Sequence, residues 1–93
     1  RTHLLRVNAL DNGLSHNRYG FAVSSRVGNS VVRNHTKRQL REIVHQVPTT
    51  PGHDVLVTAN EAVTTATFKE LTRAFATSCE KLSIYNRDLR SSL

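Results

Sequence analysis

One stretch of the chain, residues 26–41, constrains the fold and the function more than any other. It reads Arg-Val-Gly-Asn-Ser-Val-Val-Arg-Asn-His-Thr-Lys-Arg-Gln-Leu-Arg and holds five Lys and Arg residues but no Asp or Glu. Gly28 permits a tight turn, and either Asn29 or Ser30 can cap the free N–H groups of a helix that follows. The stretch therefore predicts a loop that leads into a basic helix.

A helical wheel of this segment, at about 100° per residue, separates an apolar stripe from a basic one. The apolar stripe, typical of a helix that packs on a core, contains Val32, Thr36, Leu40, Ile43, Val44 and Val47. The second stripe contains Arg33, Asn34, Lys37, Arg38, Arg41 and His45. Like charges four residues apart repel one another, so this stripe predicts an anionic partner. The alternative is a solvated charged face without a partner.

The side chains of the basic stripe suit RNA. The planar fork of Arg pairs bidentately with phosphate. Asn34 adds a donor and an acceptor that can read a base edge, a ribose hydroxyl or a hydrated metal. Over all 93 residues the net charge is +6 and the pI about 10.5, which favours nucleic acid or an acidic membrane surface as partner.

The same residues resemble the signature of the bacterial ribonuclease P protein subunit, an R-N-x-x-K-R-x-x-R pattern behind V-G-N-A-V. Residues that match at every spacing are Arg33, Asn34, Lys37, Arg38 and Arg41. His35 stands where the family often has Arg. Ser25 and Arg26 stand where it often has two lysines, so Arg26 keeps a charge and Ser25 removes one. The resemblance implies that the matching residues contact the catalytic RNA near its active centre, with Arg26 and His35 as further RNA-binding candidates.

The remainder of the chain predicts three strands and a second helix in one domain, residues 1–93. Alternation indicates strands at 3–10 and 19–24, joined by a turn around Asn12-Gly13. Pro48 to Gly52 end the basic helix, and the apolar run in 53–59 predicts a strand buried on both faces. A capping box of Thr67 and Glu70 begins the last helix. The tail, residues 86–93, is expected to fray or to add a short basic turn.

Residues on the last helix and the second strand give two expectations about packing. Phe68, Leu71, Phe75, Ser78, Cys79 and Leu82 share one helical face and are expected to form core. On the strand, the small residues Gly20, Ala22 and Ser24 lie opposite Tyr19, Phe21 and Val23. A helix is expected to pack on the small residues; close approach of another molecule is the alternative.

This order of elements predicts an α+β fold with helices packed on a small mixed sheet. The resemblance makes it similar to the second domain of ribosomal protein S5, with a left-handed βαβ crossover around the basic helix. Such a crossover is against the right-handed rule that holds in about 98% of cases. The family has a further helix before the first strand, which we expect to be absent or to lie outside this chain.

No constellation for protein-based catalysis is visible, so we expect neither catalytic residues nor a metal site. The seven acids are scattered, and no histidines stand at a ligand spacing. Cys79 is the only cysteine, which excludes an internal disulfide and fits a cytoplasmic protein. No apolar run is long enough to span a membrane, and no signal peptide is visible.

The resemblance implies that the catalytic groups belong to an RNA partner and not to this chain. It implies that the catalytic RNA, with Mg²⁺ held by the RNA, removes the 5′ leader of precursor tRNA, while the protein binds both RNAs. The leader is expected in a cleft between the basic helix and the sheet face, beside Tyr19 or Phe21. Neither a membrane nor a small-molecule substrate is expected as a partner.

Three other functions compete with this one. A ribosomal-type or other non-enzymatic RNA-binding protein shares the size, charge and fold class. A DNA-binding helix is the second, but no helix-turn-helix partner precedes the basic helix. A membrane-surface protein is the third, but its basic helix lacks the bulky apolar groups that insert at an interface.

Overall fold

The structure, a computed structural model, describes residues 4–82 and 84. Its elements are, in order, β1 (Leu5–Asp11), β2 (Arg18–Val23), the 3₁₀ turn η1 (Ser25–Val27), α1 (Ser30–Gln46), β3 (His53–Ala59), the 3₁₀ turn η2 (Glu61–Thr65) and α2 (Phe68–Lys81). The predicted order of strand, strand, helix, strand and helix is confirmed. The predicted tail lies outside the described residues.

The three strands form one mixed sheet in the order β1-β3-β2, so the last strand in sequence is the central one. β1 pairs with β3 antiparallel, with Val7 opposite Val57. β2 pairs with β3 in parallel, with Phe21 opposite Val57. β1 and β2 therefore form the two edges of the sheet, and neither pairs with the other.

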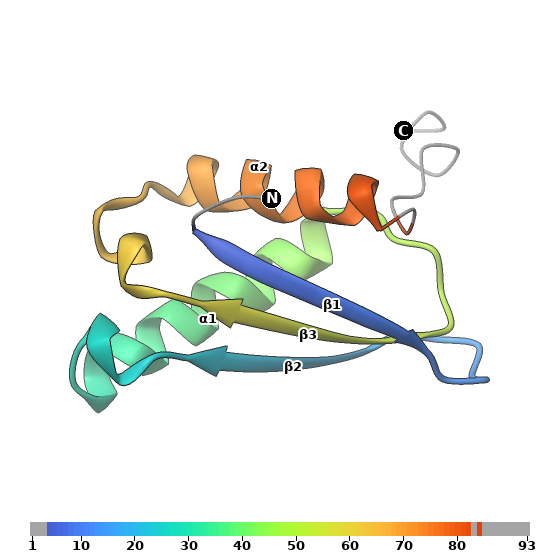
Figure 1. Ribbon diagram of the computed structural model, residues 1–93, viewed down its shortest axis with the longest axis horizontal. Helices are drawn as coiled ribbons and strands as arrows, with labels where there is room; N and C mark the ends of the chain where they lie inside the picture. The colour runs from blue at the N-terminus through green and yellow to red at the C-terminus, as the bar shows by residue number, and fades with distance from the viewer. Residues whose placement is uncertain (1–3, 83, 85–93) are drawn as a thin grey trace.

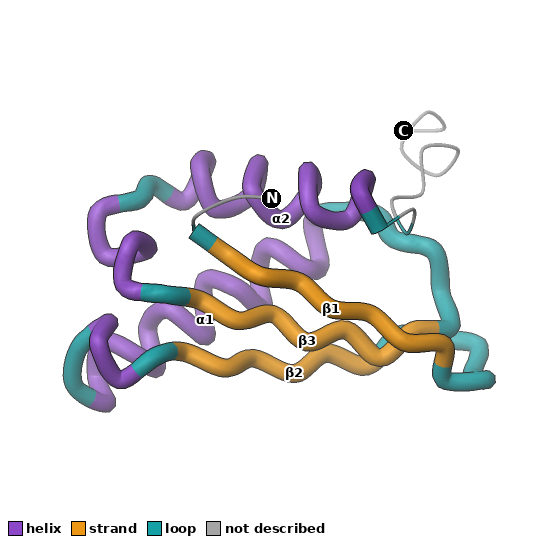
Figure 2. Tube along the Cα trace, in the orientation of Figure 1, coloured by secondary structure: helices purple, strands orange, loops and turns teal. Residues whose placement is uncertain are grey.

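The connection from β2 through α1 to β3 is left-handed. In Figure 1 both strands point the same way, β3 lies above β2, and α1 returns behind the sheet. The expected exception to the right-handed rule is therefore confirmed. Handedness decides which face a crossover helix covers. Here it places α1 on the same side as α2. No described helix covers the opposite face, which we call the open face of the sheet (Figures 1 and 2).

The core lies between this covered face and the two helices. Its largest fully buried side chains are Phe75, Leu40, Ile43, Leu71, Val55, Val57 and Cys79. Residues of the apolar stripe on α1 are buried as predicted, except Val32, which is 40% exposed near the start of the helix. Burial of the Cys79 thiol raises its pKa to about 12, as expected for a core cysteine rather than a reactive one.

Three packing predictions are wrong, and two of them have the same cause. β3 is not buried on both faces, because Leu56 is 44% exposed on the open face. None of the helices that the structure describes packs on the small residues of β2, since Gly20 and Ala22 are exposed. Both errors follow from the crossover, which leaves one face of the sheet uncovered. Phe68 and Leu82 were expected in the core, but at the two ends of α2 they are 36% and 39% exposed.

The ends of the helices follow local rules. Asn29, not Ser30, caps α1: its Oδ1 accepts a hydrogen bond from the Val32 N–H at 3.1 Å. At the start of α2 the predicted capping box is present. Thr67 Oγ1 accepts from the Glu70 N–H at 3.1 Å, and Glu70 Oε1 accepts from the Thr67 N–H at 2.8 Å. Each pair satisfies N–H groups that the first helical turn cannot bond internally.

Candidate nucleic-acid interface

The entry into α1 is built around Gly28. Its φ of +153° is a conformation that L side chains rarely adopt, and a Cβ at this position would lie 3.0 Å from the Cβ of Val32. The branched side chain of Val32 therefore packs directly over the glycine. This close contact and the Asn29 cap fix the direction in which the basic helix leaves η1.

Burial of the apolar stripe turns the basic stripe outward. Leu40 and Ile43 are 1% and 0% exposed, which anchors the middle of α1 on the core. The exposed members of the basic set are Asn34, His35, Arg38, Arg41 and His45 on α1 and Arg26 on η1. Arg33 and Lys37 are half-buried. The structure thus brings Arg33, Asn34, Lys37, Arg38 and Arg41 onto one helix, with Arg26 in the 3₁₀ turn just before it; we call these six residues the basic face.

No carboxylate neutralises the basic face within the described residues. The two ion pairs in this part of the chain are Arg18–Asp54 and His53–Asp11, both at the sheet. The buried Nε of Arg33 has no hydrogen-bond partner in the structure. Cationic groups clustered in this way raise the free energy of the folded chain unless an anion approaches them.

The two candidate aromatic residues lie on the covered face of the sheet, next to α1. Tyr19 is half-buried, and its hydroxyl lies 3.0 Å from Thr49 Oγ1, while Asn17 Nδ2 donates to it at 3.3 Å. Phe21 is also half-buried, and the guanidinium carbon of Arg41 lies over its ring, 6.0 Å from the centroid. The ring of Phe21 therefore adjoins the basic face, whereas the hydroxyl of Tyr19 is bonded to the loop after α1.

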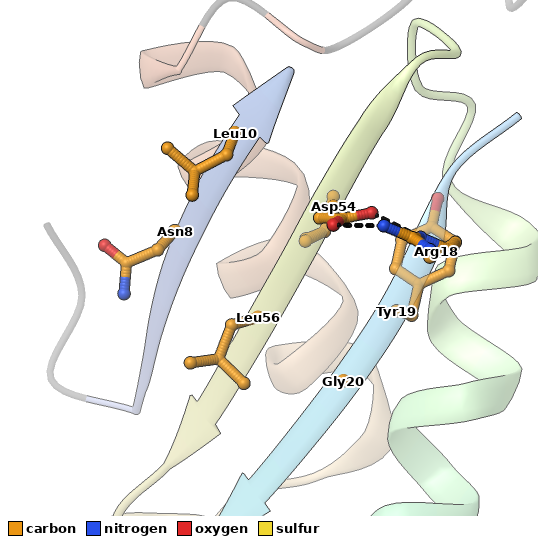
Figure 3. A pocket seen from close by; sticks show the side chains of 8 residues that line it. Asn8, Leu10, Arg18, Tyr19, Gly20, Asp54 and Leu56 are labelled. Atoms are coloured by element: carbon orange, nitrogen blue, oxygen red, sulfur yellow. Dashed lines mark hydrogen bonds and ion pairs between the residues drawn. The ribbon is translucent and has the colours of Figure 1, made fainter. Parts of the chain in front are cut away.

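A shallow hollow lies on the open face of the sheet, where Figure 3 shows side chains from all three strands. Residues that line it are Asn8, Leu10, Arg18, Tyr19, Gly20, Asp54, Val55 and Leu56. Leu10, 75% exposed, and Leu56 make its surface apolar, while Arg18 and Asp54 form an ion pair at one end. Gly20 adds no side chain, so backbone is accessible there.

The comparisons with known proteins agree with this geometry. A protein-family model described as Ribonuclease P matches residues 1–83. The chain belongs to the ribonuclease P protein family. A ribonuclease P protein component from Alkaliphilus oremlandii is 34% identical over 85 residues, which are 89% of this chain and 75% of that protein. Another, from Syntrophomonas wolfei, is 30% identical over 81 residues, or 85% of this chain and 68% of the relative.

A solved structure shows the same fold within the family. The ribonuclease P protein of Staphylococcus aureus superposes with a TM-score of 0.79 at 26% identity, over 92% of this chain and 81% of that one. The predicted α+β fold of the family is therefore confirmed. Members of the ribonuclease P protein family are subunits of the ribonucleoprotein that processes the 5′ ends of tRNA, and this chain has that role.

Sequence analysis missed the ion pair of the hollow. Arg18 and Asp54 are 36 positions apart and become neighbours only through the parallel register of β2 and β3. The available signal was their position at the start of two strands, but the register was unknown. The hollow itself was missed because the covering of the sheet was predicted on the wrong face.

Two negative findings apply to the part of the chain that the structure describes. No three His, Cys, Asp or Glu side chains lie close enough together to hold a metal ion within residues 4–82 and 84. No described helix has the length and apolar character needed to cross a membrane.

Proposed function

We propose that the basic face is the surface through which this chain binds the catalytic RNA of ribonuclease P. The observation that carries the proposal is that, among the described residues, no carboxylate forms an ion pair with this row of outward-facing cations. Phosphate groups would supply the missing charge, and each neutralised phosphate would release a counterion from the RNA. His35 and Asn34 add hydrogen-bonding groups to the same surface.

The cleavage itself is proposed to belong to the RNA. The described residues offer no group of carboxylates or histidines that fits a bound ion, so we place Mg²⁺ on the RNA and propose no protein site for it. The contribution of this chain is to bind and to position. By neutralising phosphates near the RNA's active centre, it would lower the magnesium concentration at which the RNA is active.

The second proposed partner is precursor tRNA, through its single-stranded 5′ leader. β2 is an edge strand, with the basic helix behind it and the open face, including the exposed Gly20 and Ala22, in front. A leader that follows β2 would meet cations on one side and accessible backbone and the apolar hollow on the other. Single strands bind through this combination of charge and apolar contact.

The test is cleavage of precursor tRNA at low magnesium by a bacterial ribonuclease P RNA, with and without the protein. We expect cleavage that needs both components and that is weakened by Arg38→Ala. Arg73→Ala is the matched control, because Arg73 is an exposed arginine on α2, outside the basic face. Direct RNA binding is measured alongside for each variant.

Two results would contradict the proposal. Tight RNA binding without stimulation of cleavage would favour a ribosomal-type RNA-binding protein. Equal losses for Arg38→Ala and Arg73→Ala would show that net charge, and not the basic face, controls binding.

A further inference from the structure

We infer that Phe21 and Arg41 together form a stacking platform for one unpaired nucleobase, with the guanidinium plane of Arg41 as the contacting surface. The inference rests on the proposed function and deepens it, because it assigns base contact rather than phosphate contact to one member of the basic face. The observation behind it is the position of the Arg41 guanidinium over the Phe21 ring, 6.0 Å from the centroid.

Arg41 is held differently from the other cations of the basic face. Arg38, one turn earlier, is exposed, and no aromatic contact or ion pair of its side chain is seen in the described structure. Arg41 instead lies over an aromatic ring that is itself fixed by the sheet, since Phe21 packs against the core. The ring thus places the guanidinium of Arg41, whose side chain is still exposed.

An exposed guanidinium placed over a ring suits an unpaired base. Arg planes and aromatic rings are the surfaces on which unpaired bases stack in single-strand recognition. Because the guanidinium of Arg41 is already placed over the Phe21 ring, less side-chain freedom is lost when a base stacks on it. The N–H groups at the edge of the plane stay available for a phosphate of the same nucleotide.

The surroundings of the pair favour a single strand over a duplex. Phe21 is on edge strand β2, so its half-buried ring lies at the rim of the sheet beside α1, while its neighbours Gly20 and Ala22 are exposed on the opposite face. Lys37 and Arg38 lie one turn away on α1 and supply charge for the flanking phosphates. The unpaired base could belong to the 5′ leader or to the catalytic RNA, and the experiment separates these sources.

The experiment uses the holoenzyme reconstituted with a bacterial ribonuclease P RNA. The variants are Arg41→Lys, which keeps the charge but loses the plane, and Phe21→Leu, which loses the ring but keeps an apolar side chain. We expect each to weaken binding on the order of tenfold, without a change in the salt slope, and the double variant to be no weaker than either single one. Phe21→Tyr, which keeps a ring, should bind RNA with the affinity of the natural protein.

Two arms assign the source of the base. If it belongs to the leader, the loss appears with precursor tRNA but not with a substrate that lacks the leader, and an abasic leader nucleotide removes the effect of Arg41→Lys. If it belongs to the catalytic RNA, the loss appears already in binding of that RNA alone. Arg38→Lys is the control, because it gives the loss of RNA affinity when Arg is replaced by Lys at a phosphate contact. Thermal unfolding checks that each variant is folded.

The inference is overturned if Arg41→Lys loses no more than Arg38→Lys, or if the effects of Arg41→Lys and Phe21→Leu are additive. In that case Arg41 is another phosphate contact whose stem covers an apolar ring. The proposed function fails in a different way, since it would be the unsubstituted protein that did not stimulate cleavage.

Discussion

Arg18 holds the Asp54 carboxylate through two hydrogen bonds, from Nε to Oδ1 and from Nη2 to Oδ2, each 2.7 Å long. Asn12 Nδ2 donates a third to the same carboxylate, at 3.0 Å. These bonds, those from Arg18 first and that from Asn12 second, lower the pKa of Asp54 to about 2. The contact thus ties the start of β2 and the loop after β1 to the central strand.

Asp54→Asn should change how the stability of the protein depends on pH. Because the folded-state pKa is depressed, the Asp54 contact stabilises the protein above pH about 4, and its contribution is lost as the pH falls towards 2. The size of the effect is limited by solvent, since the two side chains are 61% and 44% exposed.

The measurement for Asp54→Asn is the urea midpoint between pH 2 and pH 7. We expect the difference between the natural protein and the variant to shrink below pH about 4. Glu42→Gln, which removes an exposed acid on α1 away from this contact, is the control. A difference that is constant across the whole range would show that the ionised form of Asp54 contributes nothing.

Leu40→Ala should destabilise the protein by about 2–5 kcal/mol, because it leaves a cavity beneath α1 where the side chain is 1% exposed. Val31→Ala is the matched control: it lies on the same helix but is 75% exposed, so a change within about 0.5 kcal/mol is expected. Both values come from chemical unfolding. Equal effects of the two changes would mean that α1 is rotated relative to the core.

Arg38→Ala should flatten the dependence of log K on log[salt] for RNA binding by slightly under one unit, since one phosphate contact is lost. The slope is measured by titration of a bacterial ribonuclease P RNA at several salt concentrations. Arg73→Ala on α2 serves as the comparison. An unchanged slope for Arg38→Ala would remove Arg38 from the set of phosphate contacts.

Asn29→Asp separates stability from RNA binding. A carboxylate at this position can still accept the hydrogen bond from the Val32 N–H, and negative charge is favourable at a helix N-terminus. We therefore expect no loss of stability, whereas Asn29→Ala should cost about 0.5–2 kcal/mol. RNA binding should weaken in Asn29→Asp, because the new charge lies beside the basic face. Binding at the natural affinity would place the RNA away from the start of α1.

Asn17 joins two loops at one end of the sheet, so Asn17→Ala should be destabilising. Its Nδ2 donates to the Thr49 hydroxyl at 2.9 Å and the Thr50 carbonyl at 3.1 Å, and its Oδ1 accepts from the His53 N–H at 2.7 Å. Partners left unsatisfied cost about 1–3 kcal/mol. The free energy of unfolding measures this, with Ser15→Ala in the exposed turn as the control. A neutral Asn17→Ala would mean that water replaces these bonds.

Local patterns predicted the parts of the structure that depend on neighbours in sequence. The capping box of Thr67 and Glu70 and the outward turn of Arg38 and Arg41 follow from spacing on a helix. The exposure of Leu56 could not be predicted this way, because a continuous apolar run does not tell how many faces of a strand are covered. That depends on the hand of the crossover, about which the apolar run of β3 carries no information.

The same distinction between local and long-range contacts applies to the candidate site. The cations of the basic face come from one helix, so their spacing was sufficient to place them together. The contact of Arg41 with Phe21 and the pairing of Arg18 with Asp54 join different elements. The first needs the position of α1 on the sheet and the second needs the register of β2 and β3. Neither is encoded in any short stretch of the chain.

The strand order β1-β3-β2 has a consequence for how the protein is made on the ribosome. The two edge strands emerge first but have no contact to make with each other, because their common partner is the last strand in sequence. The sheet can therefore close only after residue 59 has been synthesised. Until then α1 has no complete sheet to pack on. The cationic helix therefore takes up its final orientation only when the sheet is completed.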